Sequence, residues 1–166
     1  MSQASFFPLV SFECVHLDIA NEMLVAWGHR MGPLRRPMGD DDAHMLYHEG
    51  RPVAVATTSS LIRQRVGGGL GHITRTDAVE LSRLCAERTG LCRVALRLWR
   101  EFVLPTRARV GVSYQDADMH TGNTYRFDGW RRAAYSRSHG TDPRSGRAGR
   151  NKWIWVYPPA AADPET

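Results

Sequence analysis

Apolar and polar positions along the chain follow two periods. Alternation with a period of two predicts β-strands over 11–16, 78–86, 109–114, 130–138 and 151–158, and a hairpin over 43–60 that turns at Glu49-Gly50. Apolar spacings of three and four residues predict helices over 18–32, 90–104 and 120–129. The resulting order, β-α-β-β-β-α-β-α-β-β, predicts a mixed sheet of about seven strands flanked by about three helices, an α/β or α+β plan.

The two longer helices have predictable boundaries and apolar stripes. Asp18 is expected to cap the first, which should stop near Gly32-Pro33. Its apolar face consists of Ala20, Met23, Leu24 and Trp27. Pro105 is expected to end the second helix, in which arginines lie opposite the apolar stripe. That stripe consists of Leu91, Val94, Ala95, Leu98 and Phe102.

The 166 residues suffice for one domain with a real core, and no repeat or linker divides them. We therefore predict a single domain over 1–157. The glycine-rich segment 63–77 is expected to be mobile, and 158–166 to form a disordered tail.

Composition excludes some classes of protein. No apolar run is long enough to cross a bilayer, and no basic segment precedes the first apolar residues, as a signal peptide would require. The cysteines Cys14, Cys85 and Cys92 lack metal-type spacing and are expected to be reduced thiols. His44 and His48 share one strand face without a third ligand, so no metal site is predicted. We expect a cytoplasmic protein, encoded by a bacterium or a phage, with no membrane partner.

The charge is unevenly distributed. The net charge is +5, and 21 of the 22 basic residues are arginine. Residues 1–60 hold seven acids and four bases, whereas 131–152 holds seven bases and one acid, Asp142. Arginine pairs well with phosphate, so this segment indicates a polyanion such as DNA. The alternative is a solvated basic face. On the first interpretation, phosphates are held by Arg131, Arg132, Arg144, Arg147 and Arg150.

The turn between strand 78–86 and helix 90–104 predicts a phosphate site, because a helix N-terminus presents unpaired N–H groups and the positive end of its dipole. The alternative is an ordinary turn that binds nothing. The residues expected to hold a phosphorylated donor are Leu84, Cys85, Arg88, Thr89, Gly90 and Arg93.

The stretch "YRFDGW" (125–130) closes the last short helix. With the order of elements, it resembles the GCN5-related N-acetyltransferase (GNAT) fold, in which a short helix typically ends Tyr-x-x-x-Gly-Phe. The resemblance implies acetyl-CoA or another acyl-CoA as donor, and implies that Tyr125 protonates the departing thiolate. "RTGLCR" (88–93) departs from the usual pyrophosphate loop of the family, because its spacing is one residue short and the second small residue is missing. Tyr125 could alternatively be a core aromatic.

A narrower resemblance rests on "ELSRL" (80–84) and "SYQDADMHTGNTYRFDGW" (113–130). These stretches are similar to the phage Mom family and related proteins of mobile elements, which have an acetyltransferase-like fold and modify the N6 amine of adenine in DNA. The resemblance implies Arg83, Ser113 and Tyr125 as site residues. The looser similarity of 20–37 adds Trp27 and His29 on the substrate side, with Gly28 between them.

The same residues have structural alternatives. Arg83 on a central strand should face a cleft or form an ion pair with Glu80 or Asp116. Asp116, Asp118 and His120 cluster in one loop, where they could orient an amine, bind a metal or cap the helix that follows. For the favoured transfer, Asp116 or His120 would accept the proton of the amine. Ser113 could be a plain capping serine.

These observations are consistent with three alternative functions. The favoured one is a Mom-like transferase acting on the N6 amine of adenine, with the base out of the stack or unpaired. The second is an acyltransferase for a small-molecule or protein amine. The third is a non-enzymatic DNA-binding or immunity module on a degenerate GNAT fold.

Overall fold

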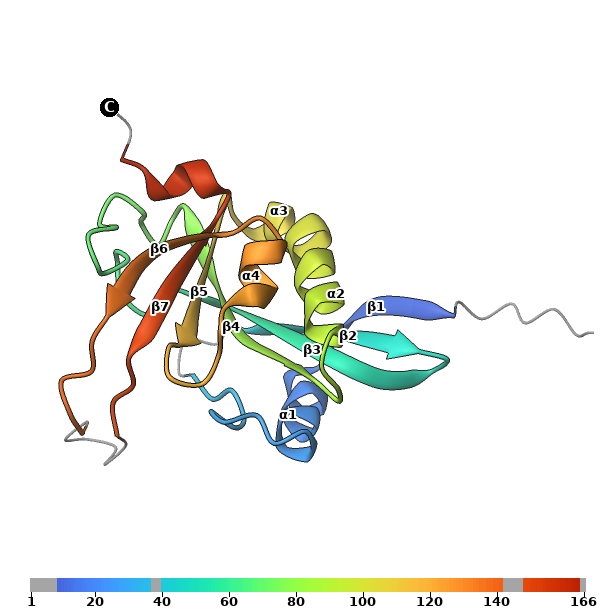
Figure 1. Ribbon diagram of the computed structural model, residues 1–166. Coiled ribbons are helices and arrows are strands. Elements are labelled where there is room, and N and C mark those ends of the chain that lie inside the picture. The colour runs from blue at the N-terminus through green and yellow to red at the C-terminus, as the bar shows by residue number, and fades with distance from the viewer. Residues whose placement is uncertain (1–8, 37–39, 142–147, 165–166) are drawn as a thin grey trace, which may run out of the picture.

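The computed structural model describes residues 9–36, 40–141 and 148–164. These residues form a twisted sheet with helices on both faces (Figure 1). The seven strands described lie in the order β1-β2-β3-β4-β5-β7-β6. Their bounds are β1 Val10–Val15, β2 Asp42–His48, β3 Arg51–Ser60, β4 Ala78–Ala86, β5 Val110–Asp116, β6 Arg131–Ser136 and β7 Lys152–Tyr157. The predicted fold class and order of elements are confirmed.

Of the described strands, β4 and β5 run parallel, and the other neighbouring pairs are antiparallel. The register of this parallel pair covers 78–80 against 110–112. Beyond it, β4 stays paired with β3 as far as Ala86, while β5 stays paired with β7 as far as Asp116. The two central strands therefore separate within the sheet (Figure 1).

Helix α1 (Leu17–Ala26) packs on β2 and β3. Ala20 and Leu24 are fully buried, as its periodicity predicts. The expected boundaries are wrong. His16, not Asp18, is the N-cap and accepts the backbone N–H of Asp18 through Nδ1 at 3.3 Å. The helix ends at Ala26 because Gly28 adopts φ +65° two residues later.

Helix α2 (Leu91–Leu98) packs on the opposite face and continues through a π-helical turn (Trp99–Val103) into α3 (Leu104–Arg107). Pro105 does not end the helix, because the π turn has already interrupted the α-helical hydrogen bonds and Pro105 lies in the first turn of α3. The predicted stripe is also wrong in part. Val94 and Phe102 are exposed, whereas Leu96 and Trp99 are fully buried against the sheet.

Segments expected to be mobile contribute to the core. Segment 63–77 places Val66, Leu70 and Ile73 over the sheet face opposite α2, so it is a packed loop. Within the expected disordered tail, Pro159–Ala162 form a 3-10 helix that buries Ala162. Both predictions overlooked apolar residues between the glycines and prolines.

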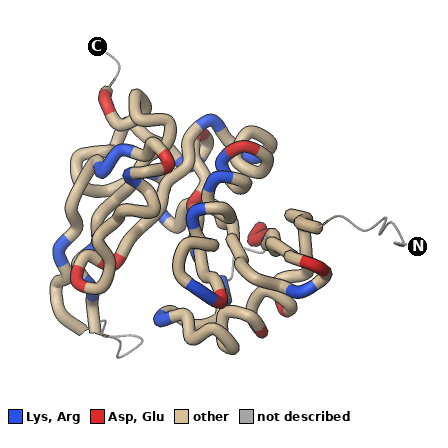
Figure 2. Tube along the Cα trace, turned by 45° about the vertical axis from the view of Figure 1, so that its right-hand side comes forward, with Lys and Arg blue, Asp and Glu red and all other residues tan. Residues whose placement is uncertain are grey.

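The remaining helix, α4 (Asn123–Phe127), lies beside α2 (Figure 1). No helix among the described residues is long and apolar enough to span a membrane. In the part of the chain that the structure describes, Lys and Arg are spread over many elements (Figure 2).

Candidate active site

The separated strands β4 and β5 form the walls of a cleft of about 480 Å³. The segment after α1, the start of α2, the loop into α4 and the end of the β6–β7 loop complete its lining. The lining contains most of the predicted site residues: Trp27, His29, Arg83, Leu84, Cys85, Arg88, Thr89, Gly90, Ser113, Asp116, His120, Tyr125 and Arg150. The fold thus brings together residues from the predicted catalytic, donor and acceptor groups.

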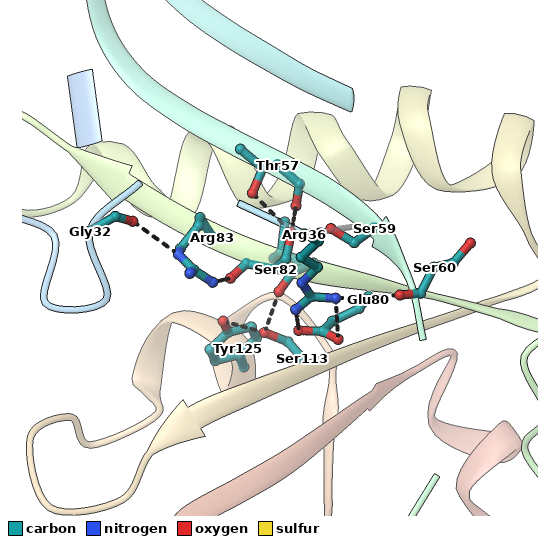
Figure 3. A network of polar contacts seen from close by, with 11 residues as sticks. Gly32, Arg36, Thr57, Ser59, Ser60, Glu80, Ser82, Arg83, Ser113 and Tyr125 are labelled. Carbon is teal, nitrogen blue, oxygen red and sulfur yellow. Dashed lines mark hydrogen bonds and ion pairs between the residues drawn. The ribbon is translucent and has the colours of Figure 1, made fainter. Parts of the chain in front are cut away.

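The hydroxyl of Tyr125 lies 2.7 Å from Ser113 Oγ, and Ser113 Oγ donates to the carbonyl of Leu81 at 3.4 Å (Figure 3). With the Ser113 proton used there, Tyr125 is the donor of the shorter bond. The Tyr125 ring stacks on Trp155 at 5.4 Å and meets the edge of Trp130 at 5.5 Å. Burial raises the pKa of Tyr125 to about 12, although the hydroxyl of Ser113 opposes the shift. Tyr125 therefore carries its proton at neutral pH.

Glycine is required at the start of α4. Gly122 has φ +78°, and a Cβ there would meet Gln115 Oε1 at 2.7 Å and overlap the ring of Trp155. Gln115 is buried, accepts Trp155 Nε1–H at 2.6 Å, and donates through Nε2 to the carbonyl of His120. This amide bridge joins β5, β7 and the loop before α4. It thereby fixes the direction from which Tyr125 enters the cleft.

Arg83 lies at an irregularity of β4. The register between β3 and β4 shifts so that Ser82 has no direct partner, and its hydroxyl bonds those of Thr57 and Ser59 at 3.0 and 2.9 Å. Arg83 is 8% exposed; its Nε donates to the carbonyl of Gly32 at 3.2 Å and its Nη1 to that of Ser82 at 2.7 Å (Figure 3). The guanidinium thus ties β4 to the segment after α1.

The two carboxylates predicted as partners of Arg83 hold other arginines. Glu80 forms a bidentate ion pair with Arg36, at 2.6 and 3.2 Å, in a largely buried position. Asp116 accepts from Arg30 at 2.7 Å, and Arg150 lies 3.7 Å from the same oxygen. The other Asp116 oxygen accepts the backbone N–H of Asp118.

His29 lies in the cleft as a neutral imidazole. Burial is the main cause that lowers its pKa, to about 4, and the nearby charges of Arg83, Arg150 and His120 add to the effect. Its Nδ1 accepts the backbone N–H of Met31 at 3.2 Å. In this tautomer Nε2 carries the proton, so His29 is a hydrogen-bond donor.

The phosphate site predicted from the sequence falls at the start of α2. Gly90 is the N-cap with φ +97°, and no side chain caps the helix. Arg88, Thr89 and Gly90 are exposed and line the cleft. Arg93 points elsewhere, with its guanidinium 5.1 Å from the ring centre of Phe127.

The basic β6–β7 region is only partly at the cleft. Arg150 lines it, but Arg131 pairs with Asp163 at 2.6 Å, and Arg132 lies over Trp153 at 4.2 Å. Arg144 and Arg147 lie outside the described residues.

Some cleft residues are not evident from the sequence pattern. The contacts of Arg30 and Gln115 could not be predicted from the sequence. Gly122 lies in the stretch that resembles Mom proteins, but only the structure shows why glycine is required there. Among the described residues, no group of three or more His, Cys, Asp or Glu could hold a metal.

No protein-family model matches the chain. No curated protein matches it either. Solved structures do match. The ribosomal-protein-S18-alanine N-acetyltransferase from Escherichia coli superposes with a TM-score of 0.61 at 13% identity, covering 89% of this chain and 92% of that one. A Bacillus subtilis acetyltransferase in complex with CoA gives 0.55 at 10%, covering 89% and 97%.

Naa50 of Arabidopsis thaliana, in complex with the bisubstrate analogue CoA-Ac-MVNAL, superposes with a TM-score of 0.57 at 10% identity, covering 90% and 98% of the two chains. These similarities establish that the chain has the GNAT acetyltransferase fold. The finer resemblance to Mom proteins stays a prediction.

Proposed function

We propose that this protein is an acyltransferase that moves an acyl group from acyl-CoA to an amine. The observation that carries the proposal is the position of the Tyr125 hydroxyl in the wall of the β4–β5 cleft, where a glycine-started helix and two tryptophans hold the ring. The GNAT fold supports the same interpretation, because solved proteins of this fold bind CoA or a CoA-based analogue.

The residues at the start of α2 fit the donor. An uncapped helix N-terminus after Gly90 suits a diphosphate, and Arg88 adds a cation at the same end of the cleft. Beyond Glu80, the edge of β4 that faces β5 has no strand partner among the described residues, so its backbone is available to an extended amide chain. When bound, a thioester would supply an activated acyl carbon.

Different residues carry out the two proton transfers, which are protonation of the leaving thiolate and removal of a proton from the amine. Tyr125 holds its proton at neutral pH and is the general acid, with Ser113 orienting its hydroxyl. Both oxygens of Asp116 are engaged, so His120 on the exposed rim is the better acceptor of the amine proton. His29 donates through Nε2 and orients the acceptor.

The test is release of thiol from acetyl-CoA with a panel of amines: a polyamine, a peptide N-terminus, an aminoalkyl phosphate and an adenine nucleotide. We expect acetyl-CoA to raise the melting temperature by mass action, and at least one amine to be acylated. Arg88→Gln removes the cation that lines the cleft at the start of α2 and should reduce the thermal shift, whereas Arg97→Gln changes an exposed cation elsewhere on α2 and is the matched control. Absence of both a thermal shift and turnover would favour the non-enzymatic alternative.

A second candidate is a nucleic acid acceptor, as in the Mom-like interpretation. Arg30, Arg83, Arg88 and Arg150 line the cleft with one acid, Asp116, which gives it a charge of 4 − 1 = +3. Such a cleft repels a cationic polyamine and favours an amine that belongs to an anionic molecule.

Mass spectrometry of nucleosides from cells that express the protein tests this candidate. A new modified adenosine is the expected result. Retention on DNA at low salt that declines steeply with added salt would support it independently, and Arg150→Gln should flatten that slope. Acylation of peptides or polyamines in preference to any nucleotide would refute it.

A further inference from the structure

Lys152 is the single lysine of the chain and, with the α-amino group, its only primary amine. It begins β7 and pairs with Asp116 across the β5–β7 register. Directly paired residues of neighbouring strands lie on the same face of a sheet, and residues two apart along a strand share that face. Lys152, Asp116 and Tyr114 therefore lie on one face, at the point where β5 borders the cleft.

Lys152 does not itself line the cleft, but its ammonium group lies next to a residue that does. Lys152 Nζ lies 5.9 Å from the ring centre of Tyr114, and both Tyr114 and Asp116 line the cleft. Among the described residues no carboxylate forms a salt bridge with Nζ. The two acids whose charges act on Lys152 instead hold arginines: Glu80 pairs with Arg36, and Asp116 pairs with Arg30. Within the described part of the chain, the amine is thus half-buried without an ion-pair partner.

The surroundings of Lys152 make its ammonium group easier to deprotonate than that of a solvated lysine. Burial lowers the pKa of Lys152, and the charges of Arg150 and Arg36 act in the same direction, while Glu80 and Asp116 oppose it. An uncharged amine is the nucleophilic form, and desolvation is a common means of activating a lysine.

We propose that Lys152 is an internal acceptor, so that the protein acylates itself at this side chain when acyl-CoA is bound. This inference rests on the proposed function. The Lys152 nitrogen forms an amide bond with the acyl carbon, the carbon–sulfur bond of the thioester breaks, and the sulfur takes a proton from Tyr125, so that CoA is released as the thiol. The proton that the nitrogen loses balances the proton that Tyr125 gives to the sulfur. The modification removes one positive charge beside the acceptor side of the cleft.

The experiment uses the full chain incubated with acetyl-CoA, followed by intact mass and peptide mapping. We expect the mass of one acetyl group on the peptide that contains Lys152, and loss of that signal in Lys152→Arg, which keeps the charge. The matched control is the double variant Lys152→Arg with Arg97→Lys, which offers an ordinary lysine at an exposed position of α2. That control should remain unmodified under the same conditions.

Two further measurements separate catalysis from simple reactivity. Tyr125→Phe should slow the modification by the same factor as acylation of an added amine. Wild type unfolded in urea should not be modified at Lys152. Equal modification of the unfolded chain, or modification of the lysine that Arg97→Lys introduces in the control, would overturn the inference.

The outcome also separates this inference from the proposed function. Acylation of an added amine with no acetyl group on Lys152 would overturn self-acylation and leave the proposed function intact. Absence of a thermal shift with acetyl-CoA, of amine acylation and of the Lys152 adduct would overturn both.

Discussion

The replacement Tyr125→Phe tests the proposed general acid with the smallest change that the site allows. The ring keeps its stacking on Trp155 and its edge contact with Trp130, and only the hydroxyl is lost. That hydroxyl makes one part-buried hydrogen bond of 2.7 Å to Ser113. Its loss should lower the free energy of unfolding by about 1 kcal/mol. For a chain of this size that corresponds to a fall in melting temperature of about 2–4 °C.

The effect on turnover should be much larger than the effect on stability. A positioned general acid contributes roughly 10²-fold or more to the rate, so kcat should fall by that factor while the Kd of acyl-CoA changes little. Tyr135→Phe, which removes a hydroxyl from an exposed tyrosine of β6 outside the cleft, is the matched control and should retain full activity. Activity and melting temperature are measured on the same preparations.

The pH dependence of stability provides a second readout for Tyr125. Its pKa is raised from 10.0 to about 12 in the folded state. Between these values the unfolded chain loses the phenol proton first, so stability is complete below pH 10 and falls as the pH rises toward 12. The shift corresponds to at most about 2.7 kcal/mol, because one pKa unit is worth about 1.4 kcal/mol. Tyr125→Phe should remove part of this alkaline loss.

Full turnover by Tyr125→Phe, with wild-type stability at neutral pH, would refute the acid role and the reasoning that places the hydroxyl at the leaving group. A loss of turnover matched by loss of folding would refute it as well, since the residue would then be a core aromatic.

Three further predictions concern the supports of the site. Gly122→Ala should destabilise the fold by about 2–4 kcal/mol, measured by urea unfolding, because φ is +78° and the new methyl would overlap Trp155; a neutral effect would show that the loop relaxes freely. Arg36→Met should reduce stability by about 3–5 kcal/mol, because Glu80 is left buried and charged, and the added change Glu80→Met should recover most of the loss. Burial lowers the pKa of His29 to about 4, so its contribution to the free energy of unfolding is complete above pH 6.5 and is lost as the pH falls toward 4. This loss of stability in acid, at most about 3 kcal/mol before solvent screening, should be smaller in His29→Asn.

Local features of the fold are predictable from the sequence because they depend on neighbours along the chain. Strand β4 runs over the predicted residues, Ala78–Ala86. The hairpin turns where Glu49 and Gly50 take φ values of +51° and +76°, as a short connection between two strands requires. The resemblance of "YRFDGW" to the helix ending of the GNAT fold likewise pointed to Tyr125, which lines the cleft.

Which face of α2 is buried could not be predicted from neighbouring residues in the sequence. Apolar residues occur on more than one side of α2, and contact with the sheet decided that Leu96 and Trp99 are buried while Val94 and Phe102 are exposed. The π turn, after which α3 continues through Pro105, was likewise not evident from the spacing of apolar residues.

The chemistry of the cleft depended on tertiary structure to a greater degree. The sequence placed Arg83, Glu80 and Asp116 in one functional region, but their partners are Gly32, Arg36 and Arg30. Arg30 and Asp116 lie 86 positions apart, and the tertiary structure places the segment after α1 against the end of β5. Ion pairs between distant segments follow from where the sheet places the backbone, and residue type alone allows many such pairs; the fold selects one.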